Sequence, residues 1–171
     1  MMDWYMKNLA FFLARDYQLY EQLLQRVEPR PEADWSIVDE MMRPKEWLFG
    51  LGSFSSSETL AVYGFGDGGH IMYLLGRLND TGQLINLIPD VPEFLELLHT
   101  ADMEELLADP RFCPVVFGLN NEMLLSYLVE CYSPETISRA KVFSLPGYEE
   151  AYPEGLVYLE QAILIVEQWM R

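Results

Sequence analysis

The sequence predicts an α/β sandwich built around a mainly parallel sheet. From residue 59 onward, short apolar runs that stop at glycine or proline alternate with segments of helical character. Strands that alternate with helices form right-handed βαβ units, and such units build a parallel sheet. A glycine-rich loop, Gly64 to Gly68, also follows the first apolar run and precedes a helix. This order is typical of a Rossmann-like fold.

Length, composition and charge bound the class of protein. The chain has 171 residues, of which 50% are hydrophobic and 13% aromatic. This length suits one compact unit with a sizeable core, and the aromatic content excludes a chain that is disordered throughout. Eleven basic and 27 acidic side chains give a formal charge of −16, which excludes a nucleic-acid binder because phosphate neutralisation requires clustered lysine and arginine. Most of the negative charge lies in residues 78–171. This charge either keeps the surface soluble or forms a face that binds a basic partner.

Residues 1–58 are predicted to form an N-terminal extension to the α/β domain of residues 59–171. Apolar residues recur every three or four positions over 3–26, which predicts one amphipathic helix. Weak alternation over 34–39 and 46–50, with Pro44 between them, predicts a small β-hairpin.

The α/β domain is predicted element by element from its apolar runs and breakers. Strands are expected over 59–63, 83–88, 113–118 and 141–145. Helices are expected over 71–77, 92–98, 103–107, 121–132 and 154–170, with a further turn over 134–139. With the glycine loop, this gives a Rossmann-like (methyltransferase-like) three-layer sandwich.

The glycine loop is the strongest motif of the sequence. Gly64, Gly66 and Gly68 permit positive φ angles and close approach of a ligand to the backbone. The helix that follows offers free N–H groups and the positive end of its dipole, which suits an anion. The motif is shared by dinucleotide-binding proteins and S-adenosylmethionine-dependent methyltransferases. A tight turn whose small residues serve packing alone is the alternative, and both interpretations stay open.

Four polar residues are predicted to line the rim of this loop: Asp67, His70, Asp90 and Asn120. Nucleotide sites usually carry an acid at the end of the second strand, and Ile88 occupies that position here. Asp90, two residues later, either swings towards the loop or caps the next helix. Asn120 either hydrogen-bonds a base or serves a turn. A nucleotide or S-adenosylmethionine is therefore a candidate cofactor whose identity the sequence leaves unknown.

The sequence offers no catalytic constellation. The two histidines, His70 and His99, are too sparse for a triad or a metal site, and we expect neither a catalytic residue nor a metal ligand. Cys113 and Cys131 form no CxxC pair, and we expect reduced thiols. Because the start of the chain lacks a secretory signal and no apolar run approaches the ~20 residues of a membrane span, we expect a cytoplasmic protein without membrane insertion.

Several short segments together resemble one family. Residues 63–70, Tyr-Gly-Phe-Gly-Asp-Gly-Gly-His, look like the glycine-loop motif of the motility accessory factor family, the bacterial flagellin glycosyltransferases. Residues 88–90, 102–111 and 147–153 resemble later segments of that family, so the likeness covers about residues 55–160. Ile88 replaces the acid of the family pattern, and Asp67 stands where an apolar residue is usual.

The resemblance implies an N-terminal Rossmann-like module of a glycosyltransferase system, with a role in protein glycosylation or flagellar assembly. In that family the sugar-transferring centre is in a later domain that 171 residues are too few to contain. The chain is then either an excised piece or a short free-standing relative.

Three functions follow from the sequence. The favoured one is an accessory, non-catalytic Rossmann-like domain. The second is a small S-adenosylmethionine- or nucleotide-dependent transferase, of glycosyl or methyl groups. The third is a protein-interaction module that binds a partner or itself through its terminal helices. The last helix carries a wide apolar stripe that includes Leu159, Ile163, Val166 and Trp169.

Overall fold

The structure of the protein is a computed structural model that describes residues 3–26, 33–35 and 54–171. The β-hairpin predicted over 34–39 and 46–50 lies outside these residues, apart from Asp34 and Trp35. Within them, no helix is both long and apolar enough to cross a membrane.

The described residues form a four-stranded sheet in which all strands run parallel. The strands are β1 (Thr59–Tyr63), β2 (Gln83–Ile88), β3 (Phe112–Val116) and β4 (Val142–Ser144), in the order β3-β2-β1-β4. The predicted α/β class with a parallel sheet is confirmed. The order is compatible with a Rossmann-like sandwich. The chain moves outward from β1 to β3 and then returns to the other side of β1, so the carboxyl ends of β1 and β4 form a topological switch point.

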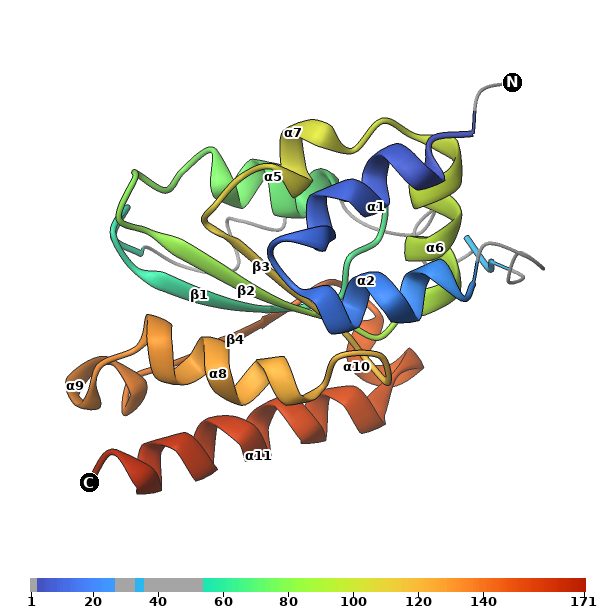
Figure 1. Cartoon of the computed structure of the whole chain (residues 1–171). Coiled ribbons are helices and arrows are strands. Elements are labelled where there is room, and N and C mark those ends of the chain that lie inside the picture. Colours follow the sequence, from blue (N-terminus) through green and yellow to red (C-terminus); the bar gives the residue numbers. More distant parts are fainter. Residues whose placement is uncertain (1–2, 27–32, 36–53) are drawn as a thin grey trace.

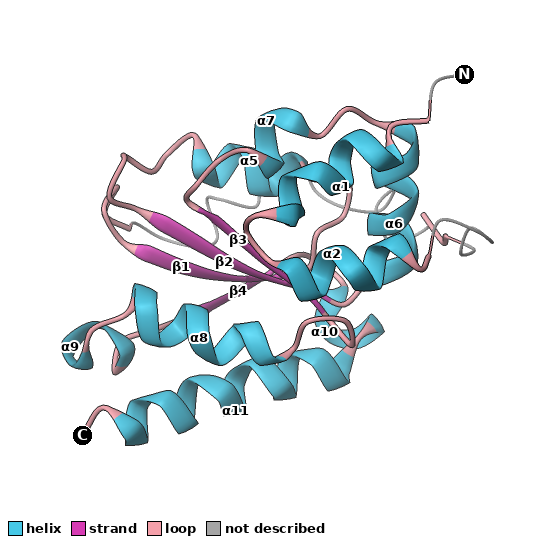
Figure 2. Cartoon of the chain, in the orientation of Figure 1, coloured by secondary structure: helices cyan, strands magenta, loops and turns pink. Residues whose placement is uncertain are grey.

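Helices cover both faces of the sheet (Figure 1). One layer holds α5 (Gly69–Leu75), α6 (Val91–Thr100) and α7 (Glu104–Leu107), together with the N-terminal helices. The other layer holds α8 (Glu122–Cys131) and α11 (Pro153–Trp169), and the short helices α9 (Pro134–Ile137) and α10 (Tyr148–Ala151) connect to it. Figure 2 shows the strands between these two layers of helices, which gives the predicted three layers.

The single helix predicted over residues 3–26 is wrong, because the structure has two helices there. Helix α1 spans Tyr5–Leu13 and α2 spans Tyr17–Leu24. Asp16 separates them: it adopts φ −150° and its carboxylate accepts a hydrogen bond from the Leu19 amide. Aspartate is a preferred N-cap because its side chain satisfies an amide that the helix leaves free. An apolar period that runs through the cap does not reveal the break.

The N-terminal helices share one core with the sheet. Asn8 fixes α1 to α6, because its side-chain amide donates to the carbonyls of Leu98 (2.7 Å) and Ala101 (2.8 Å). The ring of Tyr5 stacks on His99 at 4.0 Å. His99 is therefore a buried packing residue in the last turn of α6.

Candidate functional site

The glycine loop has the backbone geometry that the sequence predicts. Gly64, Gly66 and Gly68 all have positive φ angles, of 101°, 61° and 86°. Gly68 is the N-cap of α5, so the loop joins the carboxyl end of a buried parallel strand directly to a helix. Side chains with a Cβ rarely adopt such angles, which explains why glycine occupies all three positions.

Asp90 occupies the loop with its own carboxylate. It follows β2, and its side chain makes no cap contact with α6. Its Oδ1 instead accepts a hydrogen bond from the Phe65 amide (3.2 Å), and its Oδ2 accepts one from the Gly66 amide (2.9 Å). Of the two alternatives left open by the sequence, Asp90 swings towards the loop. A carboxylate of the protein thus binds the amides that an anionic ligand would use.

Tyr148 closes the loop from the side of β4. Its hydroxyl donates to Asp90 Oδ2 at 2.9 Å, and its ring packs against Gly64. A Cβ added at Gly64 would meet Tyr148 Cδ1 at 2.9 Å and Leu145 Cδ1 at 3.2 Å. Tyr148 begins α10 shortly after β4. Its side chain therefore lies at the switch point between β1 and β4, where open α/β sheets usually bind ligands.

Aromatic packing completes the closed loop. The ring of Phe65 is fully buried and meets Phe94 of α6 edge-on at 4.9 Å. Tyr63 donates a hydrogen bond to the Tyr152 carbonyl, and Tyr152 in turn stacks on Tyr148. The described contacts therefore tie the loop to α6 and α10.

Burial shifts the ionisation of both members of the central pair. Burial raises the pKa of Asp90 from 3.8 to about 6, although the hydrogen bonds from Gly66 and Tyr148 act against this rise. Burial and the negative charge of Asp90 raise the pKa of Tyr148, so Tyr148 is the donor of the pair. The carboxyl group of Asp90 consequently changes charge near neutral pH.

Glu93 is a buried carboxylate that the sequence analysis did not single out. It lies in the first turn of α6, where only 3% of its surface is exposed. Its Oε1 accepts a hydrogen bond from the Asp34 amide (2.7 Å), while Oε2 has no hydrogen-bond partner among the described residues. Glu93 follows Asp90 by three residues, so the two side chains lie on the same turn. This spacing is the one signal in the sequence that could have linked the two acids.

The structure brings only some of the predicted rim residues to the loop. Asp67 is exposed in the loop, and its carboxylate accepts a hydrogen bond from the Gly69 amide (2.8 Å). His70 is buried in the first turn of α5. Asp90 lies inside the loop, fully buried, rather than on its rim. Whether any of them contacts a ligand stays a prediction.

Asn120 lies beside β3, where it holds protein groups. Its side-chain amide donates to Asp16 Oδ2 (2.8 Å) and to the Pro114 carbonyl (3.3 Å), and its oxygen accepts from the Val116 amide (2.7 Å). Asn120 therefore connects the end of β3 to the cap of α2. This matches the turn alternative of the sequence analysis.

An open hollow of about 480 Å³ lies at the opposite, amino-terminal edge of the sheet. It is lined by Asp80, Glu105, Ala108, Asp109, Pro110 and Arg111. The guanidinium of Arg111 is already bound to Asp109 (2.7 Å) and to the Leu78 carbonyl (2.8 Å). The positive charge of Arg111 is therefore engaged by groups of the protein. The other charged side chains that line the hollow are acidic.

Most of the loop amides are thus bonded to groups of the protein itself. The amides of Phe65, Gly66 and Gly69 are bonded to side chains, and the Gly68 amide is bonded to the Phe65 carbonyl. Among the residues that the structure describes, no group of three or more histidine, cysteine or acidic side chains is placed to hold a metal ion.

Comparisons with protein-family models, curated proteins and solved structures give no match to this chain.

Proposed function

We propose that the chain is an accessory, non-catalytic Rossmann-like domain whose glycine loop is a structural joint. The supporting observation is the Asp90 carboxylate, which accepts the Phe65 and Gly66 amides inside the loop. A nucleotide phosphate at these amides would have to displace a buried carboxylate and the Tyr148 ring together.

The cost of bringing an anion to this loop is large. Two like charges 4 Å apart repel by about 4 kcal/mol in an environment of effective dielectric constant ~20. That energy corresponds to roughly a thousandfold loss of affinity. The sequence resemblance to the N-terminal part of flagellin-modifying glycosyltransferases agrees with an accessory role, because their sugar-transferring centre is in another domain.

A ligand panel tests this proposal against the alternative of a small transferase. A ligand at 100 times its Kd stabilises a protein by about 2.7 kcal/mol. For a chain of this size, that raises the melting temperature by roughly 5–10 °C. We expect millimolar S-adenosylmethionine, CMP, UDP and NAD to leave the melting temperature unchanged.

The Tyr148→Ala variant is the matched control, because it removes the ring that lies against Gly64. If a ligand raises the melting temperature of this variant alone, the Tyr148 ring is the group that keeps the ligand out of the loop. A clear rise in the melting temperature of the unmodified protein with any of the four ligands contradicts a non-catalytic loop and supports the transferase.

Self-association through α11 is the second candidate function. Val157, Leu164, Ile165 and Trp169 of this helix are exposed, the last by 63%. The predicted stripe is thus divided, since Leu159, Ile163 and Val166 are buried against the protein. The residues from Gln161 to Val166 carry no charge, and the exposed Glu160 borders this apolar patch one turn before Leu164. The mass of the protein in solution, measured by light scattering over a range of concentrations, tests this candidate.

A further inference from the structure

The segment of residues 33–35 is held on α6 by two acidic side chains of that helix. The Asp34 amide donates to Glu93 Oε1 (2.7 Å), and the Trp35 indole Nε1 donates to Glu96 Oε2 (3.0 Å). The two acids are three residues apart and therefore lie on one face of the helix. Glu93 is buried and Glu96 is half-buried, so the bond to Glu93 is the inner anchor of the segment.

Glu93 shares its turn of α6 with Asp90, which binds the glycine loop. The Asp90 carbonyl accepts a hydrogen bond from the Phe94 amide (3.1 Å), which closes the first turn of the helix. Asp90 is the N-cap and Glu93 is the third helical residue, and a side chain at that third position reaches back towards the N-cap. Both carboxyl groups are buried. One turn of helix thus connects the loop to the segment of residues 33–35.

The two acids differ in how fully their oxygens are bonded. Both oxygens of Asp90 accept hydrogen bonds, from the amides of Phe65 and Gly66. Glu93 Oε2 is buried and has no hydrogen-bond partner among the described residues. A buried carboxylate oxygen without a donor has lost its hydration without compensation. Glu93 is therefore the acid that moves more readily when the negative charge on this turn increases.

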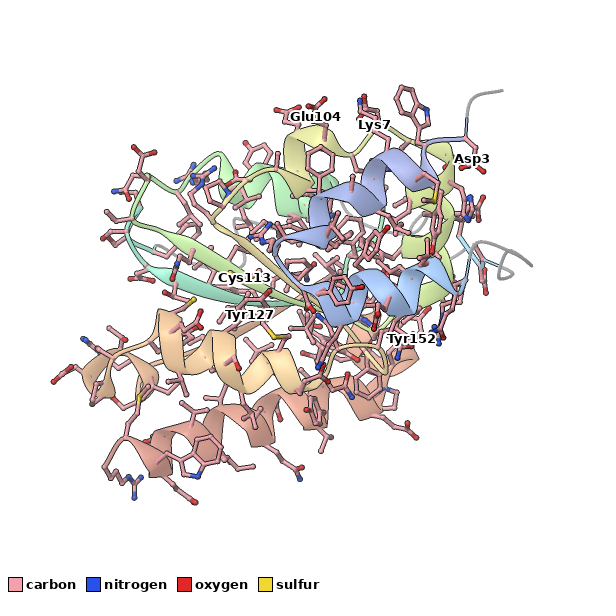
Figure 3. All side chains as sticks on the ribbon, in the orientation of Figure 1. Asp3, Lys7, Glu104, Cys113, Tyr127 and Tyr152 are labelled. Carbon is pink, nitrogen blue, oxygen red and sulfur yellow. The ribbon has the colours of Figure 1, made fainter. Side chains whose placement is uncertain are left out.

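Tyrosines face the two acids from α10 and its end. Tyr148 donates to Asp90 and stacks on Tyr152 at 5.5 Å. Figure 3 labels Tyr152, at the edge of the sheet where α6 and α10 begin. Burial and the negative charges of Glu93, Asp90 and Asp34 raise the pKa of Tyr152 to about 12. Both tyrosines are therefore neutral at neutral pH and do not offset the charge of the acids.

The loop and α5 contribute the other titratable groups near Asp90. Asp67 is exposed, and its carboxylate is bonded to the Gly69 amide. His70 is buried in the first turn of α5. Because histidines in general titrate near neutral pH, a test must separate a change at His70 from a change at Asp90.

We propose that the segment of residues 33–35 forms a pH-sensitive contact with α6, which is released when Asp90 becomes charged. With Asp90 neutral, the Glu93 carboxylate holds the Asp34 amide. Loss of the Asp90 proton adds a second negative charge to the same turn, and like charges in the interior repel each other. Glu93 then turns towards water, which hydrates its unbonded oxygen, and the Asp34 amide loses its acceptor. The outer bond from Trp35 to Glu96 contributes little by itself.

The direction of the switch follows from the burial of Asp90. Because burial raises the pKa of Asp90 to about 6, the segment is bound below this pH and released above it. The contact does not depend on whether the glycine loop binds a ligand. Its test therefore contains no ligand, and its failure leaves the function proposed for the loop untouched.

The test follows the Trp35 indole N–H by NMR of the full chain between pH 5 and pH 8, with the signal assigned through Trp35→Phe. We expect this signal to move towards that of a solvent-exposed indole, with a midpoint near pH 6. Protection of the Asp34 amide, corrected for the intrinsic pH dependence of exchange, should fall about tenfold, the change that a coupling of one pKa unit produces. The signal of Trp169, which is exposed on α11, should stay in place.

Asp90→Asn and Glu93→Gln are the paired controls. Asparagine cannot become charged, and glutamine keeps an oxygen for the Asp34 amide without the charge, so the segment should stay bound in both variants at every pH. A Trp35 signal that does not move in the unmodified protein overturns the proposal. So does a shift that persists in Asp90→Asn, because it then belongs to another group such as His70.

The unmodified protein gives a decisive comparison that needs neither variant to fold. The side-chain carboxyl carbon of Asp90 and the Trp35 indole must titrate with the same midpoint. Different midpoints for these two signals would show that the charge of Asp90 does not control the segment.

Discussion

Asp90 is the residue on which the interpretation of the site depends. Its carboxylate binds the glycine loop after β1 and Tyr148 at the start of α10, and its backbone carbonyl accepts a hydrogen bond from the Phe94 amide of α6. Burying a carboxylate costs folding free energy unless hydrogen bonds compensate for the lost hydration. Three donors do so here, yet burial still dominates and leaves the pKa of Asp90 at about 6.

The raised pKa of Asp90 predicts a specific pH dependence of stability. Because the folded state holds this proton more tightly than the unfolded state, the stabilisation is complete below pH 3.8 and is lost as the pH rises through about 6. The Asp90→Asn variant cannot titrate at this position. Relative to that variant, we expect the unmodified protein to lose about 2 kcal/mol of unfolding free energy between pH 4 and pH 7.

Urea unfolding of both proteins across this pH range measures the difference in their unfolding free energies. The contributions of the other carboxylates are the same in both proteins and cancel in this difference. Tyr148→Phe is a second variant: loss of the hydroxyl that donates to Asp90 should move the midpoint of the pH dependence upward. A difference between the unmodified protein and Asp90→Asn that stays constant with pH would show that Asp90 does not titrate in this range.

At the scale of elements, α11 combines a buried face with an exposed apolar face. A stable dimer buries about 800 Å² on each partner. A helix of 17 residues is about 25 Å long and offers only part of that area. Association through α11 alone should therefore be weak and dependent on concentration.

Light scattering at increasing protein concentration should show a rising average mass. Replacement of Leu164 and Trp169 by glutamine should abolish this rise, because it makes the exposed face polar. Tyr73→Gln is the matched control, since Tyr73 is also a large exposed residue but lies on α5, in the other layer. A monomer at all concentrations would eliminate self-association through α11.

For the whole molecule, the sequence predicts the layers well because they arise from local patterns. The strands of residues 59–63 and 83–88 are found with the expected bounds, since apolar runs between breakers mark buried parallel strands. The three loop glycines have the expected positive φ angles. Local signals of this kind need only a few neighbouring residues.

The sequence does not predict contacts between distant segments. The Tyr148 hydroxyl reaches Asp90 across 58 positions, and Asn120 reaches the cap of α2 across 104. The break at Asp16 is missed for a related reason: an apolar period continues through a cap that only the hydrogen bond to Leu19 reveals.

Amide hydrogen exchange at Phe65 and Gly66, followed by NMR, tests most directly whether the protein closes its own glycine loop. Both amides donate to Asp90 in the interior, and bonded, buried amides exchange only when the structure opens. We expect slow exchange at both positions in the free protein, unchanged by millimolar nucleotide or S-adenosylmethionine. Fast exchange in the free protein that becomes slow when one of these ligands is added would contradict the account.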